Sequence, residues 1–290
     1  MIEVTTCPIC QSSQLEKKFP VKDHSISKEE FEIKQCSNCS LLITTPRPEE
    51  LSHYYQSDDY VSHSSKSTNL INKIYLVART YTIKCKLNLV NSLQPKGSAL
   101  DIGCGTGAFL STLKKNGWKV TGVEPNNEAR QKATHETNQT IHSSYESIKD
   151  QFTLITLWHV LEHLPNLDLA LKKIYDLLEP SGVLLIAVPN HNSFDAKKYK
   201  DHWAGYDVPR HLWHFNQKSM VSLLQKHELK LDRIIPMKLD AFYVSMLSES
   251  YLNNGHSLLN SLKGFFTGLF SNYIAMKTGQ YSSLIYIAKK

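Results

Sequence analysis

The chain has 290 residues, of which 41% are hydrophobic and 21% are charged, as in a globular protein with one large domain and room for a small module. Its formal net charge of +6 is spread without a block of like charges, which argues against a dedicated nucleic-acid binder. The first twenty residues are polar and the apolar runs are strand-sized, so neither a signal peptide nor a membrane span is predicted. We therefore expect a cytoplasmic protein whose cysteines are reduced thiols or metal ligands.

The N-terminal region carries two C-x-x-C pairs, and these four cysteines are Cys7, Cys10, Cys36 and Cys39. Each pair places two thiolates on one tight turn, and two such turns complete the four-sulfur shell that zinc prefers. Because four ligands leave no open position, the expected zinc ion is structural. A redox dithiol and unligated cysteines are the alternatives. Residues 1–50 are therefore predicted to be a zinc-ribbon module, and residues 51–95 a helical lid or linker.

Residues 96–290 alternate between apolar runs and helical patterns, and they are predicted to form one domain. The expected strands are 98–102, 119–124, 139–142, 152–157, 182–188, 230–239 and 283–288. The expected helices are 108–116, 127–136, 167–178, 217–227 and two stretches within 241–277. Strands that alternate with helices imply parallel pairing with right-handed crossovers. The fold class is therefore α/β, with a seven-stranded, mostly parallel Rossmann-like sheet and helices on both faces.

A glycine-rich turn follows the first of these strands, in the sequence Asp101-Ile-Gly103-Cys-Gly105-Thr-Gly107. Without Cβ atoms, the turn can pass close beneath a ligand. A dinucleotide loop reads G-x-G-x-x-G, whereas here the spacing is G-x-G-x-G with an acid two residues before it. That carboxylate would repel a pyrophosphate and suits a ligand with a sulfonium and an amino group. Glu124, at the end of the next strand, is placed to accept ribose hydroxyls, although nicotinamide enzymes also carry an acid there.

Three segments together resemble class I S-adenosylmethionine-dependent methyltransferases. They are the glycine turn, Phe152–Leu164 and Leu178–Asn190. The cysteine pairs, followed by Thr45-Pro-Arg-Pro48, are similar to those of bacterial methyltransferases with a zinc ribbon, which are related to ubiquinone-type O-methyltransferases and sugar methyltransferases. The resemblance implies S-adenosyl-L-methionine as the cofactor beside the structural Zn2+.

The same resemblance implies a set of cofactor-binding residues. Gly103, Gly105 and Gly107 would line the methionine part, Asp101 would hold the amino group, and Glu124 would take the ribose. Ser144 and Tyr145 occupy the usual adenine position, and Trp158 and His159 would lie beside the donor methyl group. The full set of expected contacts is Asp101, Gly103, Cys104, Gly105, Gly107, Glu124, Pro125, Ser144, Tyr145, Trp158 and His159.

Histidines supply the candidate bases. A hydroxyl acceptor gains from a base that removes its proton, and histidine titrates in the right range. Segment 203–215 follows the fifth strand and mixes aromatic, acidic and basic residues, which suits an acceptor pocket but also a structural cap. We expect His211 to be the base, with His159 as the second choice and Asp207 as an orienting partner. Tyr54, Tyr55, Tyr60 and His63 fit either a lid over the cofactor or a surface linker.

Apolar residues recur at helical spacing near the C-terminus, from Leu258 to Phe270, and such stripes are ordinarily core or a homodimer surface. Lys263 is the only charge within 257–276, so contact with a membrane or a lipid-linked acceptor stays open. The expected activity is methylation of a small-molecule acceptor, by preference on oxygen of a sugar, quinone or secondary metabolite. RNA methylation and a non-catalytic scaffold are the alternatives, and nucleic acid is the less favoured partner.

Overall fold

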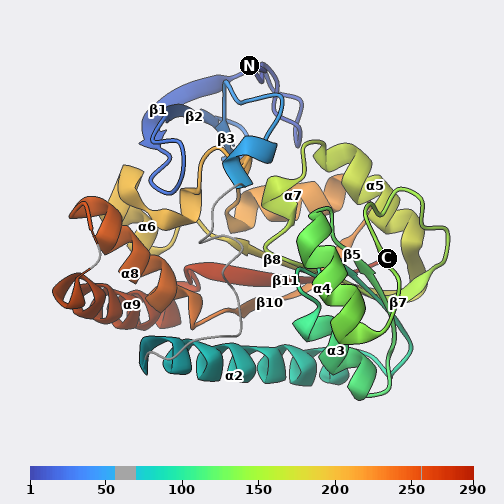
Figure 1. Ribbon diagram of the computed structural model, residues 1–290. Coiled ribbons are helices and arrows are strands. Elements are labelled where there is room, and N and C mark those ends of the chain that lie inside the picture. Colours follow the sequence, from blue (N-terminus) through green and yellow to red (C-terminus); the bar gives the residue numbers. More distant parts are fainter. Residues whose placement is uncertain (56–69, 256) are drawn as a thin grey trace. The chain divides into compact units, whose positions relative to one another are not determined.

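The computed structural model describes residues 1–55, 70–255 and 257–290, and within 70–78 it describes the helix but not its side chains (Figure 1). The predicted lid residues Tyr60 and His63 lie outside what is described. The chain divides into two compact units. Unit 1 comprises Met1–Gln56, His159–Leu171 and Ile186–Ile287, and unit 2 comprises Ser57–Trp158, Lys172–Leu185 and Ala288–Lys290.

The larger sheet has seven strands in the order β10-β11-β8-β7-β4-β5-β6. Their bounds are β4 Ser98–Ile102, β5 Lys119–Val123, β6 Ile141–His142, β7 Phe152–Trp158, β8 Leu178–Pro189, β10 Lys230–Pro236 and β11 Ser283–Lys289. Strand β4 pairs in parallel with β5 and β7, and β5 pairs in parallel with β6. Residues 183–188 of β8 are fully buried, as expected for a strand covered on both faces. The predicted α/β fold with a seven-stranded, mostly parallel sheet is confirmed.

The helices that follow these strands also form where the sequence predicts them. They are α3 Ala108–Lys115, α4 Asn127–Thr137, α5 Leu167–Leu177 and α7 Gln217–Lys226, and α2 spans Leu70–Leu93 ahead of β4. Asparagines cap two of them: Asn126 accepts a hydrogen bond from the Ala129 amide, and Asn216 forms a capping box with Ser219. These caps explain why helix starts are readable from the sequence.

Most predicted boundaries differ from the observed ones by no more than two residues, and two differ by three or more. Strand β10 ends at Pro236 instead of residue 239, because proline has no amide hydrogen to continue the ladder. Strand β8 begins at Leu178, four residues before Gly182. The insertion after β10 is a pair of helices, α8 Asp240–Leu252 and α9 Leu258–Thr278, which lie against each other. Among the described residues, no helix is both long enough and apolar enough to cross a membrane.

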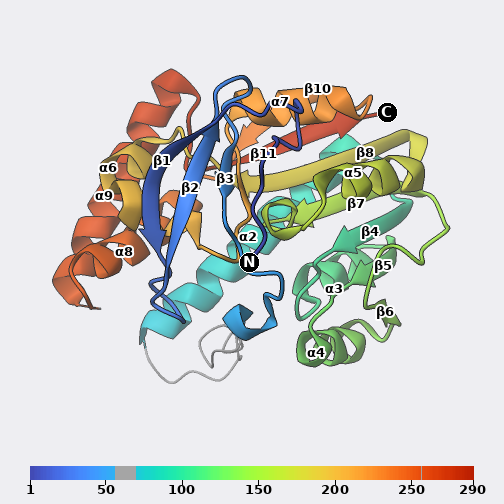
Figure 2. The same ribbon diagram turned by 90° about the horizontal axis from the view of Figure 1, so that it is seen from above.

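The second sheet lies in unit 1 and joins the N-terminal ribbon to a distant segment. Its strands are β1 Leu15–Lys22, β2 Glu30–Cys36, β3 Leu42–Thr44 and β9 Trp213–His214, in that order. Figure 2 shows the first three side by side. Strand β3 pairs with β9 through Leu42–His214 and Ile43–Trp213. The apolar face of the hairpin packs on aromatic residues of segment 199–206, which include Tyr199, Trp203 and Tyr206. The hydrophobic core of the ribbon therefore includes side chains from outside residues 1–50.

Candidate active site

The glycine turn of unit 2 folds back over the end of β5. The amides of Gly103 and Cys104 both donate to the carbonyl of Val123, at 2.8 and 3.0 Å. Gly105 and Gly107 have φ angles of 55° and 82°, which lie in the left-handed region that favours glycine. A Cβ atom on Gly107 would lie 2.9 Å from Cα of Ala133, whereas one on Gly105 would meet nothing within 4 Å. Gly107 therefore permits close packing on α4, and Gly105 faces open space that a ligand can approach.

Two buried carboxylates flank this turn. Asp101 is 2% exposed, and its Oδ1 accepts a hydrogen bond of 2.7 Å from Thr156 Oγ1. Both oxygens of Glu124 accept backbone hydrogen bonds of 2.9 Å, one from the Gly105 amide and one from the Asn126 amide. Glu124 therefore shapes the turn, and each of its oxygens keeps a second lone pair for a ligand hydroxyl.

Burial raises the pKa of both carboxyl groups. Desolvation is the largest cause for Asp101, whose pKa rises to about 6, and the nearby Glu124 charge adds to it. Desolvation likewise raises the pKa of Glu124, against the hydrogen bonds from the amides of Asn126 and Gly105. Two poorly solvated negative groups beside an open glycine turn favour a ligand that carries positive charge and hydroxyl groups. An incoming pyrophosphate would be repelled.

Apart from His159, which belongs to unit 1, the remaining predicted cofactor contacts lie in the same unit. The Cys104 side chain is buried with Leu110, Ala133 and Ile141, so only its backbone can face a ligand. Pro125 directly follows Glu124, and its carbonyl accepts a hydrogen bond from Arg130. Ser144 and Tyr145, which are both half-buried, follow β6.

Sequence reasoning missed two basic residues of α2, Arg79 and Lys86. Arg79 donates to the Thr106 hydroxyl at 3.3 Å, and Lys86 Nζ lies 4.1 Å from the ring centroid of Trp158. The indole nitrogen of Trp158 is buried and has no hydrogen-bond partner among the described residues, so it is available to a ligand acceptor. No sequence signal connects α2 to the glycine turn, because the contact depends on how the helix packs.

In unit 1, His159 lies between two carboxylates. Its Nδ1 is 3.3 Å from Glu162 and its Nε2 is 3.0 Å from Asp240. Burial alone would lower the pKa of His159, but the interactions with Asp240 and Glu162 outweigh it and raise the pKa to about 10. His159 is therefore a cation at neutral pH, which suits an electrostatic role better than the role of a base. Its φ of 57° lies in the left-handed region, which is rare for a residue with a side chain.

A compact cluster of Glu162, His163 and His211 lies nearby in the same unit. Their ligand atoms lie within 4.8 Å of one another, so this donor set could hold a divalent cation. Glu162 is 1% exposed, and among the described residues neither of its carboxylate oxygens forms a hydrogen bond. His163 Nδ1 lies 3.0 Å from the Tyr55 hydroxyl, and burial followed by the proximity of His211 lowers the pKa of His163 to about 4.

The tautomer of His211 follows from its contacts. Its Nδ1 lies 3.0 Å from the carbonyl oxygen of Gly205, and since a carbonyl only accepts, Nδ1 carries the hydrogen. The Nε2 lone pair is then free to accept a proton. Asp207 is a poor orienting partner for this nitrogen, because their separation is 3.9 Å while Asp207 binds Arg210 at 2.6 and 3.0 Å. Sequence reasoning missed Glu162, a second carboxylate near His211, whose oxygen lies within 4.8 Å of a His211 ring nitrogen.

Arg210 links the ribbon to the segment that carries His211. Besides Asp207, its guanidinium donates to Asp23 at 3.1 Å and to the Tyr54 carbonyl at 3.0 Å, and its side chain is 2% exposed. Thr44 adds a hydrogen bond of 2.7 Å to the His211 carbonyl. The ribbon therefore fixes the backbone on both sides of His211.

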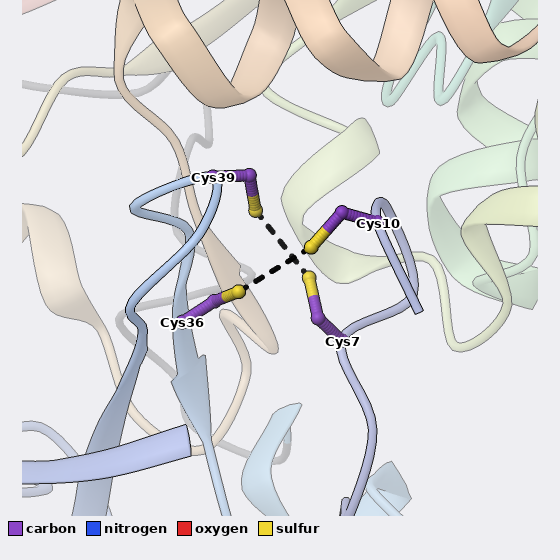
Figure 3. A group of neighbouring side chains, drawn as sticks. All are labelled: Cys7, Cys10, Cys36 and Cys39. Atoms are coloured by element: carbon purple, nitrogen blue, oxygen red, sulfur yellow. Dashed lines mark hydrogen bonds between the residues drawn. The ribbon is translucent and has the colours of Figure 1, made fainter. Parts of the chain in front are cut away.

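The four cysteines converge as the spacing predicts (Figure 3). Their sulfur atoms all lie within 4.8 Å of one another, with Cys7–Cys39 at 3.4 Å and Cys10–Cys36 at 3.5 Å. A tetrahedral zinc ion with Zn–S bonds of about 2.3 Å has S–S separations of roughly 3.8 Å, so the cluster is of a suitable size. The two turns are alike, because the amides of Gln11 and Ser40 donate to the carbonyls of Cys7 and Cys36.

A cavity of about 460 Å³ opens elsewhere in unit 1, between the ribbon and segment 191–206. Lys18, Lys197 and Lys200 line it, together with the aromatic rings of Phe19 and Tyr206. Three lysines against one aspartate give this cavity a positive character that suits an anionic group.

Fold and site together define a class I methyltransferase. Residues 78–234 match the family described as "Methyltransferase domain", and the chain belongs to that family.

The curated relatives include ubiquinone biosynthesis O-methyltransferases. The protein from Aeromonas salmonicida is 30% identical over 103 residues, which are 32% of this chain and 43% of the relative. The protein from Coxiella burnetii is 32% identical over 102 residues, which are 32% of this chain and 44% of the relative. The chain thus spans less than half the length of the curated relatives it matches.

Solved structures share the fold. Magnesium protoporphyrin IX methyltransferase from Synechocystis PCC 6803, with bound SAH, aligns with a TM-score of 0.52 at 15% identity over 82% of this chain and 97% of that one. A structure described as a putative sarcosine dimethylglycine methyltransferase from Galdieria sulphuraria aligns with a TM-score of 0.51 at 15% identity over 74% of this chain and 86% of that one.

Proposed function

We propose that this protein transfers a methyl group from S-adenosylmethionine to an oxygen of a small-molecule acceptor. The observation that carries the proposal is the open glycine turn flanked by the buried carboxylates Asp101 and Glu124. The donor brings an ammonium group, a sulfonium and two ribose hydroxyls. These are the groups that two poorly solvated carboxylates favour. Membership of the methyltransferase family supports the same donor.

Calorimetric titration with S-adenosylhomocysteine tests the donor site. We expect saturable binding at a stoichiometry of one, with no heat from NADH under the same conditions. A non-catalytic scaffold predicts no binding of either compound. Binding of NADH in place of S-adenosylhomocysteine would reject the methyl-donor assignment outright.

The proposed chemistry is an in-line displacement in which the acceptor oxygen attacks the donor methyl carbon and the methyl–sulfur bond breaks. Because the sulfonium is already activated, this chain's residues mainly position the partners and take up the acceptor proton. We assign that proton to His211 Nε2, whose lone pair is left free by the Nδ1 hydrogen bond to Gly205. The buried carboxylate of Glu162 then stabilises the imidazolium, and the cation His159 balances the charge of Glu162.

Oxygen is the proposed acceptor atom because the curated relatives are named O-methyltransferases. A transfer assay with radiolabelled S-adenosylmethionine should compare a catechol or quinol, a nucleotide sugar and bulk RNA as acceptors. We expect label on a hydroxylated small molecule. RNA methylation would instead give labelled RNA and tight, steeply salt-dependent retention on heparin.

We also propose that Cys7, Cys10, Cys36 and Cys39 hold one structural Zn2+. The residues fit the ion, since four sulfur donors converge and no fifth ligand is needed. When bound, the ion cross-links the two turns and supplies folding energy to the ribbon. Elemental analysis should find about one zinc per chain, falling towards zero in Cys36→Ser. A full zinc content in that variant would mean that the zinc is bound at another site.

A further inference from the structure

Helix α9 has the opposite polarity to an ordinary surface helix. Its buried side chains are small or polar: Asn260, Gly264, Thr267, Gly268, Ser271 and Ala275. Its exposed side chains are large and apolar: Leu258, Leu259, Leu262, Phe265, Phe266, Leu269, Phe270, Tyr273 and Met276, each between 44% and 78% exposed. Surface helices of water-soluble proteins place such residues inward. The outward face of α9 therefore needs a partner.

The inward face is fixed by close contact with α8, which lies beside it (Figure 1). A Cβ atom on Gly264 would lie 2.4 Å from Cα of Met246, and one on Gly268 would lie 2.8 Å from Cα of Phe242. The spacing Gly264-x-x-x-Gly268 thus lets the two helix backbones touch, which is how helices pair in lipid. Helix α9 cannot rotate to bury its aromatic residues without breaking this contact.

Hydrogen bonds hold the same orientation. Ser271 donates to the buried Asp195 at 2.6 Å, and Asp195 also accepts from Trp203 and Ser282 at 2.7 Å each. The Asn260 side chain donates to the Gly255 carbonyl at 2.8 Å. Ser271 and Asn260 therefore make their hydrogen bonds on the inward face of the helix, and these bonds hold the apolar stripe outward.

Geometry and charge indicate which partner the apolar stripe of α9 binds. At 100° per residue, the nine exposed apolar residues form one convex stripe about 140° wide. The charged residues of α9 are Lys263 and Lys277, and it carries no acidic residue. Two basic residues beside a wide apolar stripe match an anionic lipid surface. A second copy of α9 would bring the same two lysines and no acidic residue to pair with them.

We propose that the apolar stripe of α9 binds the surface of an anionic membrane, with the aromatic and leucine side chains entering the interface. This would place the protein beside lipid-embedded molecules. The inference does not depend on the proposed donor or acceptor, because vesicle binding is measured without either.

Flotation with lipid vesicles tests the proposal on the full chain. The wild-type protein should float with vesicles of phosphatidylcholine containing 30% phosphatidylglycerol and bind pure phosphatidylcholine at least tenfold more weakly. The double variant Phe266→Ser/Phe270→Ser should lose binding to the anionic vesicles by tenfold or more. Lys263→Gln/Lys277→Gln should reduce binding to the anionic vesicles towards the level seen with phosphatidylcholine.

The matched control is Leu169→Ser, because Leu169 is an apolar side chain that is 66% exposed on α5 and is not part of the α9 stripe. It should float like the wild type, and all variants should keep the wild-type circular dichroism spectrum and melting temperature. Equal flotation of the wild type and the phenylalanine variant overturns the proposal. So does a wild-type protein that ignores vesicles but sediments as a dimer that the phenylalanine variant dissociates, since a second copy would then be the partner.

Discussion

The proposed contact of Asp101 with the donor ammonium group predicts that donor binding depends on pH. Its carboxyl pKa is raised to about 6, so the protonated form stabilises the fold at low pH, and this contribution is lost as pH rises through 6. The ionised form that binds an ammonium group makes up roughly one tenth of the protein at pH 5. We therefore expect the affinity for S-adenosylhomocysteine to fall about tenfold between pH 7.5 and pH 5.

Calorimetric titrations at the two pH values measure this change, and Asp101→Asn is the control. The asparagine side chain cannot ionise, so this variant should bind S-adenosylhomocysteine more weakly than the wild type. Its affinity should be nearly the same at pH 5 and pH 7.5. A wild-type affinity that does not change with pH would remove Asp101 from the donor site.

The two glycines of the turn should respond differently to the same substitution. Gly105→Ala places a methyl group in open space and costs about 1–2 kcal/mol for the left-handed backbone, but it obstructs the ligand. Gly107→Ala adds the same backbone strain to a contact of 2.9 Å with Ala133, so its cost should reach roughly 2–5 kcal/mol. Urea unfolding and S-adenosylhomocysteine titration separate the two effects. If Gly105→Ala binds normally, the ligand does not approach that face.

His211 is the residue on which the proposed proton transfer depends. His211→Gln should lower kcat by on the order of 100-fold or more, while the affinity for S-adenosylhomocysteine stays within about twofold. His135→Gln, at an exposed position of α4, serves as the control and should leave both kcat and the affinity for S-adenosylhomocysteine unchanged. Unchanged turnover in His211→Gln would exclude it from the chemistry.

At the scale of elements, the turn after β1 is tied to segment 207–211 by the buried pair Asp23–Arg210. Removing Arg210 leaves the buried carboxylate of Asp23 without its cationic partner, which costs about 3–5 kcal/mol. We expect Arg210→Leu to show this loss in urea unfolding. Asp23→Ala should lose less, because Arg210 keeps its hydrogen bonds to Asp207, and the double variant should lose less than the sum. Additive losses would mean that the two side chains do not depend on each other.

The Asp23–Arg210 pair also makes the free energy of unfolding depend on pH. Burial alone would raise the pKa of Asp23, but hydrogen bonds from Ser27 and Arg210 outweigh it and lower the pKa below its unfolded value of 3.8. Its contribution is therefore present above pH 4 and is lost as the pH falls further. The loss of stability in Asp23→Ala should shrink in strongly acidic solution.

At the scale of the whole molecule, the ribbon supports the segment that carries His211, through β3–β9 pairing and the Thr44 hydrogen bond. Removal of zinc, by a chelator or by Cys36→Ser, should lower kcat at least tenfold and increase hydrogen exchange in β9. Binding of S-adenosylhomocysteine should persist, because the glycine turn belongs to the other unit. Full activity without zinc would show that the ribbon does not position His211.

Local patterns in the sequence predicted most of the fold and part of the site. Apolar periodicity and helix caps located the strands and helices, and the paired C-x-x-C spacing located the sulfur cluster, since each signal lies within a few neighbouring residues. The glycine turn with Asp101 and Glu124 was readable for the same reason, because a strand, a turn and the next strand occupy one short stretch.

The remaining features depend on contacts between residues far apart in the chain. The partnership of Arg210 with Asp23, the ion pairs of His159 and the packing of Lys86 on Trp158 all join distant segments, so no local pattern reveals them. The sequence alone determined the class of fold, the sulfur cluster and the position of the glycine turn. Only the tertiary structure decided which histidine is already paired with carboxylates, that Glu162 lies near His211 in addition to Asp207, and that α9 turns its apolar side outward. Burial and charge pairing depend on which side chains pack against one another, and packing brings together residues that lie far apart in the sequence.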